Sequence, residues 1–415
     1  MVDINFLGGC REVGRMGIVI DNSKQRFLLD YGVNVEHMDV PLQPEMPIDA
    51  LFLSHAHLDH SGHIPSLYNQ GWKGRVYATP TTFDIANMLL KDSLKVQKIK
   101  GLQAKYTHND VATLNSRGIN VNFGKAKHFK SADVTFHGAG HVPGSSSILI
   151  ETEGKSILFT GDTKFEETML MKKAFTNFHD IDALITESTY SYKNHPPRME
   201  TVNKMKDMIT KTIQNGGSVI LPSFAVGRTQ EVLLVAAELE YPIFMDGMGI
   251  GSTRYTLQHP ESVKDHNRLR EAFGRARKVR SHNQRKDAIK NPGIIISTAG
   301  MLNGGPVHFY ISKMIDRPEC TMIMNGFMVP GTVGRTLLDT GRYVFEGKDQ
   351  KPKMRIEFMD LSAHCGRDNL IKFIEKVNPG KTFLVHGERT QEFSKHLNTL
   401  DLNAYAPKNG EKIKI

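Results

Sequence analysis

The amino-acid sequence predicts an α/β protein in which an α/β domain built on a parallel sheet is inserted into a domain of two packed sheets. Up to about residue 194 the chain reads as many short apolar or alternating strands, ended by glycine, asparagine or polar residues. Residues 195–351 instead alternate continuously apolar strands with helical stretches, which indicates a parallel sheet covered on both faces. The pattern of short strands ended by polar or glycine residues returns in residues 352–415. We therefore expect residues 1–194 and 352–415 to form one domain around the insertion.

The first segment holds most of the predicted strands. Strands this numerous and closely spaced usually pack as sheets. Between them, residues 60–70 and 81–105 have helical patterns. The strands are expected within residues 4–9, 17–21, 26–32, 50–57, 75–79, 133–141, 146–151 and 156–162.

The inserted segment contains four apolar runs that each end in polar or glycine residues. Ligands of parallel sheets bind outside the carboxyl ends of the strands. Here those ends carry Ser223, Asp246, Thr298 and Asn325. The last segment then continues with a strand-like run in "MRIEFMDLSAHCG", a helix near 367–377 and the strand "TFLVHGE".

Charge and composition restrict the class of protein. The formal net charge is +9, and residues 264–290 hold ten Lys/Arg against three Asp/Glu, a balance that favours anionic partners such as nucleic acid. The segment "LLKDSLKVQKIKGLQAK" is also basic, although either segment alone would be an ordinary solvated face. No apolar run is long enough to cross a membrane, and no secretory signal is visible. Three distant cysteines fit a reducing compartment, so we expect a cytoplasmic protein.

The stretch "LSHAHLDHSGHIP" places metal-ligand side chains at unusual density directly after an apolar strand. Imidazoles and carboxylates make poor core material, but they are good ligands for zinc-like ions. Three later strands also end in a glycine-flanked His or Asp. Alone, such a histidine would usually be a hydrogen-bonded polar residue, and such an aspartate a turn residue. Seven ligands exceed one tetrahedral ion but suit two ions that share a carboxylate. The candidate ligands are His55, His57, Asp59, His60, His141, Asp162 and His386.

With these residues in view, the chain resembles the metallo-β-lactamase superfamily, and within it the β-CASP nucleases. HxHxDH followed by a later His and a later Asp is the superfamily pattern. The narrower resemblance spans nearly the whole chain, through "GGCREVGR", "ESTYSYKNHPPR", "LPSFAVGRTQE", "STAGMLNGGP", "GFMVPGTVGR", "LSAHCGRDNL" and "LVHGE". It is most similar to RNase J and to archaeal relatives of the endonuclease subunit of the cleavage and polyadenylation specificity factor. The resemblance implies a metallo-β-lactamase αββα sandwich with an inserted β-CASP domain.

The resemblance also implies roles for individual residues. His55, His57 and His141 would hold one zinc, while Asp59, His60 and His386 would hold a second. Asp162 would bridge the two ions, Asp30 would orient a ligand histidine, and Asp59 would also count among the catalytic residues. His364 would be the motif B histidine beside the scissile phosphate, paired with Glu187, and would protonate the leaving 3′ oxygen. Many family members have an aspartate where this chain has Gly366.

RNA is the substrate that the resemblance favours. In the family, a histidine at the position of His386 goes with RNA rather than DNA. The inserted domain would act as a cap, and the basic 264–290 segment would hold phosphates of single-stranded RNA. Family members often form homodimers or join larger RNA-processing complexes. Candidate RNA-binding residues in the family motifs are Ser223, Arg228, Arg335 and Ser362.

Two other functions stay open from the sequence. A small-molecule hydrolase could use the same fold, and a non-catalytic RNA-binding subunit could keep the fold without the reaction. The inserted domain argues against the first, and the complete set of ligands with Glu187 and His364 argues against the second. Endonuclease and 5′-to-3′ exonuclease activities share one metal site, so the sequence does not separate them.

Overall fold

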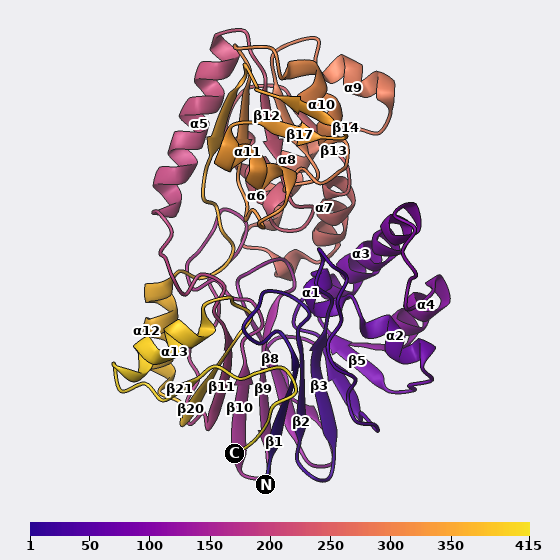
Figure 1. Cartoon of the computed structure of the whole chain (residues 1–415), viewed down its shortest axis with the longest axis vertical. Helices are drawn as coiled ribbons and strands as arrows, with labels where there is room; N and C mark the ends of the chain where they lie inside the picture. Colours follow the sequence, from indigo (N-terminus) through magenta and orange to yellow (C-terminus); the bar gives the residue numbers. More distant parts are fainter. The chain divides into compact units, whose positions relative to one another are not determined.

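The computed structural model describes all 415 residues, and the chain divides into two compact units (Figure 1). Unit 1 comprises Met1–Glu167, Lys173–Asn194 and His364–Ile415. Unit 2 comprises Thr168–Lys172 and His195–Ala363. The second boundary differs from the expected residue 352, because strand β19 (Arg355–Phe358) pairs with the sheet of unit 2.

Two seven-stranded sheets form unit 1. Sheet A consists of β1 (Asp3–Gly8), β2 (Gly17–Asp21), β3 (Arg26–Tyr31), β4 (Ala50–Phe52), β5 (Arg75–Ala78), β6 (Gly118–Asn120) and β22 (Lys412–Lys414), in the order β22-β1-β2-β3-β4-β5-β6. Sheet B consists of β7 (Lys127–His128), β8 (Asp133–Gly138), β9 (Ser146–Thr152), β10 (Lys155–Phe159), β11 (Ala183–Glu187), β20 (Lys381–Val385) and β21 (Ala404–Tyr405), in the order β21-β20-β11-β10-β9-β8-β7.

Both sheets of unit 1 are part antiparallel and part parallel. In sheet A, strands β3 to β6 run parallel, and in sheet B β10, β11, β20 and β21 do. Strand β8 is antiparallel to β9, which is antiparallel to β10, so β8 and β10 point the same way. The carboxyl ends of these parallel strands therefore gather at one edge of each sheet, where loops can present functional side chains.

The two sheets of unit 1 pack face to face through aromatic and branched side chains. Along β3, Phe27 and Leu29 enter this core, whereas the intervening Leu28 points to the opposite face, as strand pleating requires. Phe52 of sheet A lies edge-on to Phe136 of sheet B with ring centroids 6.1 Å apart. Each such aromatic pair removes a large apolar area from water and fixes how the sheets pack.

Helices cover the outer faces of unit 1. They are α1 (Leu58–Ser61), α2 (Ile64–Asn69), α3 (Pro80–Ile99), α4 (His108–Arg117), α12 (Arg367–Val377) and α13 (Thr390–Asn398). Phe373 of α12 and Phe393 of α13 share a buried cluster with Leu184 and Leu384 of sheet B, and Figure 1 shows both helices beside β20 and β21. This layer order is the αββα sandwich that the sequence predicted.

Unit 2 is built on a six-stranded parallel sheet. Its strands are β12 (Val219–Pro222), β13 (Ile243–Asp246), β14 (Arg277–Val279), β15 (Ile294–Ser297), β16 (Thr321–Met324) and β19, in the order β14-β13-β15-β12-β16-β19. A separate hairpin joins β17 (Tyr343–Phe345) and β18 (Lys348–Gln350). The helices are α5 (Arg198–Gln214), α6 (Arg228–Ala236), α7 (Gly249–Gln258), α8 (His266–Arg275), α9 (His282–Ala288), α10 (Val307–Met314) and α11 (Val333–Thr340), with a 3₁₀ turn at Pro260–Ser262.

Both faces of the unit 2 sheet are buried. Ile294 and Ile296 of β15 join the cluster containing α5, α6 and α8, while Ile295 joins the cluster containing α10 and α11. A strand buried on both faces has no polar side to alternate with, which explains the continuous apolar runs in the sequence. The predicted fold class, including the inserted α/β domain on a parallel sheet, is confirmed.

One predicted helix is shorter in the structure. The helical pattern of residues 81–105 corresponds to α3, which ends at Ile99 and is followed by Gly101 at φ +67°. Glycine adopts this left-handed conformation without steric cost, so the chain leaves the helix there. The helix expected near residues 367–377 coincides with α12. None of the helices is long and apolar enough to cross a lipid bilayer.

Candidate metal centre

All seven predicted ligands lie just beyond the carboxyl ends of strands in unit 1. Sheet A supplies four of them from the loop and short helix after β4, and sheet B supplies three from the loops after β8, β10 and β20. His55 and His60 are fully buried, and His141, Asp162 and His386 are nearly so. Because each strand is held within its sheet, the strand ends position these side chains even before a metal ion binds.

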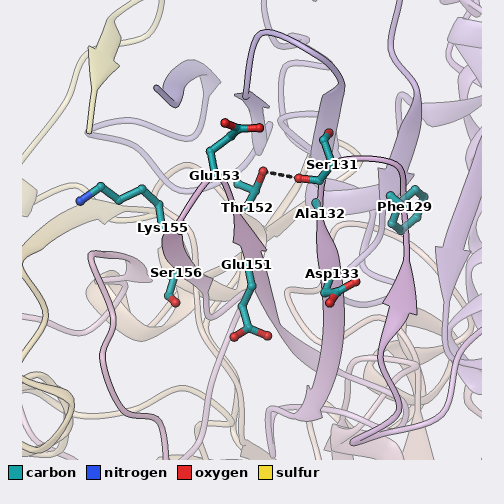
Figure 2. Close-up of a pocket in the computed structure, with 10 residues that line it drawn as sticks. Phe129, Ser131, Ala132, Asp133, Glu151, Thr152, Glu153, Lys155 and Ser156 are labelled. Carbon is teal, nitrogen blue, oxygen red and sulfur yellow. Dashed lines mark hydrogen bonds between the residues drawn. The ribbon is translucent and has the colours of Figure 1, made fainter.

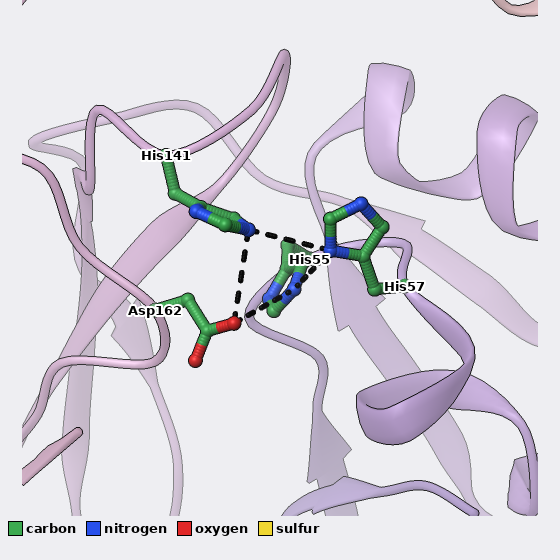
Figure 3. Close-up of side chains that lie close together, drawn as sticks. All are labelled: His55, His57, His141 and Asp162. Carbon is green, nitrogen blue, oxygen red and sulfur yellow. Dashed lines mark hydrogen bonds and ion pairs between the residues drawn. The ribbon is translucent and has the colours of Figure 1, made fainter. Parts of the chain in front are cut away.

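Four side chains make the first donor group, which Figure 3 shows converging on one point. His57 Nδ1 lies 3.2 Å from His55 Nε2 and 3.3 Å from His141 Nε2. Asp162 Oδ2 lies 3.6 Å from His55 Nε2 and 3.7 Å from His141 Nε2. A tetrahedral zinc with ligands at about 2.0–2.1 Å would have donor-to-donor edges of roughly 3.3–3.4 Å. The four atoms therefore match the donor set and spacing of a tetrahedral site.

The second donor group uses the other oxygen of the same aspartate. Asp162 Oδ1 lies 3.4 Å from His60 Nε2 and 3.5 Å from His386 Nδ1. Asp59 Oδ2 lies 3.2 Å from His386 Nε2 and 4.0 Å from His60 Nε2. The atoms of each donor group lie within 4.8 Å of one another. Asp162 thus belongs to both groups, one oxygen facing each, as a bridging carboxylate does.

Two buried polar atoms in this centre lack a hydrogen-bond partner within the chain. They are His60 Nε2 and Asp162 Oδ1, the atoms that face each other in the second group. Buried polar atoms are normally satisfied, because leaving them unpaired costs free energy. A cation between these atoms would complete both, so the residues present fit bound metal ions.

Two donors of the first group are held in the forms that bind a cation. Burial opposes ionisation of Asp162, but the surrounding imidazoles of His386, His60 and His364 outweigh it and hold the pKa of Asp162 well below its usual value. Burial also lowers the pKa of His55 well below the ordinary value, so this imidazole is neutral. A neutral imidazole and an ionised carboxylate are the forms that bind metals.

Asp30 organises two of the ligand histidines from behind. Its Oδ2 lies 2.6 Å from His60 Nδ1 and accepts a hydrogen bond from Ser54 Oγ at 2.7 Å. Ser54 Oγ in turn lies 3.0 Å from His55 Nδ1. Asp30 also accepts from the Ser54 backbone N–H at 2.7 Å and sits at φ +53°, a strained conformation for a residue with a side chain. The Asp30 carboxylate therefore orients one histidine of each donor group. It contacts His60 directly and acts on His55 through Ser54.

Replacing Asp30 is expected to weaken metal binding without removing a ligand. Asp30→Ala leaves His60 Nδ1 without its acceptor, and losses of this kind typically lower metal affinity about 10- to 100-fold. Asp30→Asn is the matched control, because asparagine tolerates positive φ and keeps one acceptor oxygen. Competition against a metal chelator measures both affinities. Equal affinities for wild type and Asp30→Ala would refute this role.

The buried Glu187 pairs with the partly exposed His364 next to the predicted ligands. His364 Nδ1 lies 2.9 Å from Glu187 Oε2 and 3.1 Å from Oε1, and 3.9 Å from the bridging Asp162 Oδ2. Glu187 also accepts a hydrogen bond from the Thr163 backbone N–H at 2.7 Å. Burial by itself lowers the pKa of His364, but the Glu187 and Asp162 carboxylates outweigh it and raise that pKa to about 9.

The loop carrying His364 is held to the loop carrying Asp162. The buried ammonium of Lys164 donates to the His364 carbonyl oxygen at 3.0 Å. Cys365 Sγ donates to the Thr163 carbonyl at 3.1 Å. Gly366 is the N-cap of α12 and has no side chain with which to cap it. Lys164, Cys365 and Ser54 give no recognisable sequence signal, because their roles depend on which loops the fold brings together.

The four predicted RNA-binding residues differ in how exposed their side chains are. Ser223 is fully buried, and its hydroxyl donates to the Leu221 carbonyl at 3.2 Å. Arg228 is buried with its guanidinium 3.2 Å from Glu231. Ser362 is also buried, whereas Arg335 is about half exposed and pairs with Asp339 at 2.8 Å. Of these four side chains, that of Arg335 is the most accessible to a polynucleotide.

The basic 264–290 segment forms α8, β14 and α9, and several of its cations have partners within unit 2. Arg285 makes two hydrogen bonds to Asp246, at 2.6 and 3.2 Å, and Arg268 pairs with Glu238. Arg275 donates to the Leu239 carbonyl at 2.8 Å. The segment's charge therefore contributes to the structure of unit 2 as well as to its surface.

A cavity of about 510 Å³ lies at the end of the sheet B strands away from the metal centre, around the hairpin between β9 and β10 (Figure 2). Thr152 Oγ1 donates to the Ser131 carbonyl at 2.6 Å across it. Its lining has no histidine or cysteine, so it lacks the side chains typical of a zinc centre.

Comparison with known sequences identifies three domains in the chain. The metallo-β-lactamase superfamily profile matches residues 14–194, the Beta-Casp domain matches residues 229–337, and the Zn-dependent metallo-hydrolase RNA specificity domain matches residues 350–407. The last match covers the strand β20 and His386.

Relatives with similar sequences cover the whole chain. A protein named "Probable RNase MJ4" from Methanocaldococcus jannaschii is 35% identical over 100% of both chains. "RNase aCSPSF2" from Saccharolobus solfataricus is 35% identical over 99% of this chain and 85% of its own length. "Transcription termination factor FttA" of M. jannaschii is 32% identical over 100% of this chain and 72% of its own.

A solved structure supports the same fold. The crystal structure of a protein of unknown function from Enterococcus faecalis V583 aligns over 99% of each chain, with a TM-score of 0.65 and 14% identity. Together with the full-length relatives and the three domain matches, the fold confirms the resemblance predicted from the motifs. The chain belongs to the β-CASP ribonuclease family of the metallo-β-lactamase superfamily.

Proposed function

We propose that the protein is a zinc-dependent ribonuclease that hydrolyses phosphodiester bonds of single-stranded RNA, leaving 5′-phosphate and 3′-hydroxyl ends. The observation that carries this proposal is the sharing of Asp162 between two donor groups, with the His364–Glu187 pair 3.9 Å away. The relatives named as RNases and the matching RNA specificity domain support RNA as the substrate. The histidine-rich donor set favours zinc over magnesium, which prefers oxygen ligands.

The chain would hold two ions with separate sets of ligands. His55, His57 and His141 would bind the first, and Asp59, His60 and His386 the second. Asp162 would contribute one oxygen to each. Two metal ions bound here would supply an activated water and neutralise the charge that develops on the phosphate oxygens.

The residues of the chain would position the phosphodiester and move a proton. Glu187 keeps the imidazole of His364 oriented and favours its charged form, because the carboxylate accepts from Nδ1. A charged His364 would stabilise negative charge on the phosphate and donate a proton to the departing 3′ oxygen. The P–O3′ bond breaks as water attacks phosphorus from the opposite side, which yields the 5′-phosphate and the 3′-hydroxyl.

The same geometry weighs against the two other functions. A small-molecule hydrolase could use the same ions, but the acid that the His364–Glu187 pair provides suits the departing 3′ oxygen of a phosphodiester. A non-catalytic RNA-binding subunit would not require seven converging donors with unsatisfied buried atoms. Metal analysis separates the last case: about two zinc ions per chain support the nuclease, and a metal-free protein that binds RNA supports the subunit.

A cleavage assay tests the proposal and its mode of action. Circular single-stranded RNA and linear 5′-labelled RNA are incubated with wild type and with the Asp59→Ala/His60→Ala variant. Cutting of the circle by wild type alone indicates an endonuclease. Release of mononucleotides from linear 5′-phosphate RNA alone indicates a 5′-to-3′ exonuclease using the same centre. Intact RNA in both reactions, with metal bound, would contradict the proposal.

A further inference from the structure

A second cavity of unit 1 has the side chains of an anion site. It has a volume of about 240 Å³ and combines two guanidinium groups, an imidazole, a serine hydroxyl and a tyrosine hydroxyl with a single carboxylate. We call it the Ser191–Arg389 pocket. It is lined by Ser191, Tyr192, Arg367, Arg389, Glu392, Phe393 and His396.

The serine hydroxyl of this pocket is buried and lacks a partner. Ser191 is 4% exposed, and its Oγ makes no hydrogen bond within the chain. A buried hydroxyl is normally satisfied, since leaving it unpaired costs free energy. An oxygen-rich anion in the pocket would accept the hydrogen bond that Ser191 can donate.

The arginines of the pocket are placed to bind a phosphate. The Arg389 guanidinium lies 5.0 Å from the centre of the Tyr192 ring, which holds it against the pocket wall. Its carboxylate neighbour competes weakly, because Glu392 lies 4.0 Å away and is 76% exposed to water. Arg367 is the first residue of α12, and its backbone N–H donates to the Lys193 carbonyl at 3.0 Å. Planar guanidinium groups match the geometry of phosphate oxygens.

Two helices begin at the pocket. The N-caps of α12 and α13 are Gly366 and Arg389, and neither makes a side-chain cap. The first two N–H groups of α12 already donate within the chain, from Arg367 to Lys193 and from Asp368 to Asn194, so the helix contribution to an anion comes from the start of α13. The unpaired Ser191 hydroxyl provides an independent indication of a ligand at the same place.

The pocket lies close to the metal centre along three separate segments. Each segment carries one residue of the centre and, three or four positions later, one residue of the pocket. Three or four residues of extended chain span at most about 11 to 14 Å. A single polynucleotide can therefore reach from the metal centre to the pocket. The pairs are Glu187 with Ser191, His364 with Arg367, and His386 with Arg389.

We infer that the Ser191–Arg389 pocket binds a phosphate group of the RNA, close to the phosphate that is cut. This inference rests on the proposed ribonuclease function. The phosphate is either an internal one of the backbone or the 5′-terminal one, since both present the same oxygens. In either case the pocket sets the register of the strand across the metal centre.

Equilibrium binding of a fluorescent single-stranded RNA tests the pocket. The His364→Ala chain is used for binding so that the RNA stays intact, which a gel verifies. In this background, Arg389→Gln and Arg367→Gln are each expected to raise Kd roughly fivefold to tenfold. Each should also reduce the slope of log K against log salt by about 0.7, the value for one lost contact with a single strand. Arg75→Gln, an exposed arginine at the start of β5, is the control and should change neither.

Two further arms identify the phosphate. If the loss of affinity occurs with 5′-phosphate RNA but not with 5′-hydroxyl RNA, the pocket holds the terminal phosphate. An equal loss for both RNAs indicates an internal phosphate. If Kd and the salt slope are unchanged in both arginine variants while wild type still cleaves RNA, the inference that the pocket binds a phosphate is wrong. If wild type neither binds nor cleaves RNA, the proposed function itself fails.

Discussion

Asp162→Asn is expected to abolish RNA cleavage and to remove bound metal from both donor groups. Asparagine keeps the shape of the side chain but offers one neutral oxygen in place of two charged ones, so it cannot bridge. Loss of metal-ion catalysis costs several kcal/mol of transition-state stabilisation. About 4 kcal/mol corresponds to roughly a thousandfold in rate, and we expect a decrease at least that large.

The measurement combines elemental analysis with the initial rate of cleavage. Wild type should contain about two zinc ions per chain, and Asp162→Asn substantially less than one. Asp133→Asn is the matched control, because Asp133 is half exposed at the far end of β8 and pairs with His128. A variant that keeps full metal content would show that Asp162 is not a shared ligand, even if its activity fell.

His364→Ala is expected to lower kcat by about 10²- to 10⁴-fold while the metal content stays at the wild-type level. This is the range that a positioned general acid contributes. Glu187→Gln should have a smaller effect of the same kind, because the amide can still accept a hydrogen bond from Nδ1 but no longer favours the charged imidazole. His128→Ala, on the surface of the same unit, serves as the control.

A modified substrate distinguishes proton donation from simple positioning. When the scissile 3′ oxygen is replaced by sulfur, the leaving group departs as a thiolate, whose conjugate acid has a pKa near that of cysteine at about 8.5. Such a leaving group needs no proton, so the defect of His364→Ala should shrink strongly with this RNA. An unchanged defect would mean that His364 positions the phosphate instead. Loss of zinc in His364→Ala would make it a ligand.

The sequence predicts the metal centre better than its surroundings. The HxHxDH stretch and the three later residues each follow an apolar strand, and the carboxyl ends of parallel strands lie at one edge of a sheet. That rule groups the donors within each sheet, but it does not show that the ends of the two sheets meet; the density of HxHxDH and the number of ligands led to the expectation of one centre. The rule could not reveal Ser54, which relays the Asp30 carboxylate to His55, because a serine before a histidine is common.

The RNA-binding residues were harder to predict from the sequence than the metal centre. Arg228 follows a glycine loop at the start of a helix, a pattern typical of anion sites, but the structure buries its guanidinium against Glu231. The residues of the Ser191–Arg389 pocket lie up to 205 positions apart in the sequence, from Ser191 to His396. No local pattern connects them, since only the pairing of β11 with β20 and the docking of α12 bring them together.

The origin of the ligands in both sheets has a consequence for the folding of unit 1. His55, His57, Asp59 and His60 follow a strand of sheet A, whereas His141, Asp162 and His386 follow strands of sheet B. Each ion would therefore act as a cross-link between the two layers of the sandwich, comparable to a disulfide. Ligands that bind only the folded state stabilise it by about 1.4 kcal/mol for each tenfold excess over Kd. We expect the chelated protein to melt at lower temperature and to be cut faster by proteases, so that metal supply would set the lifetime of the chain as well as its activity.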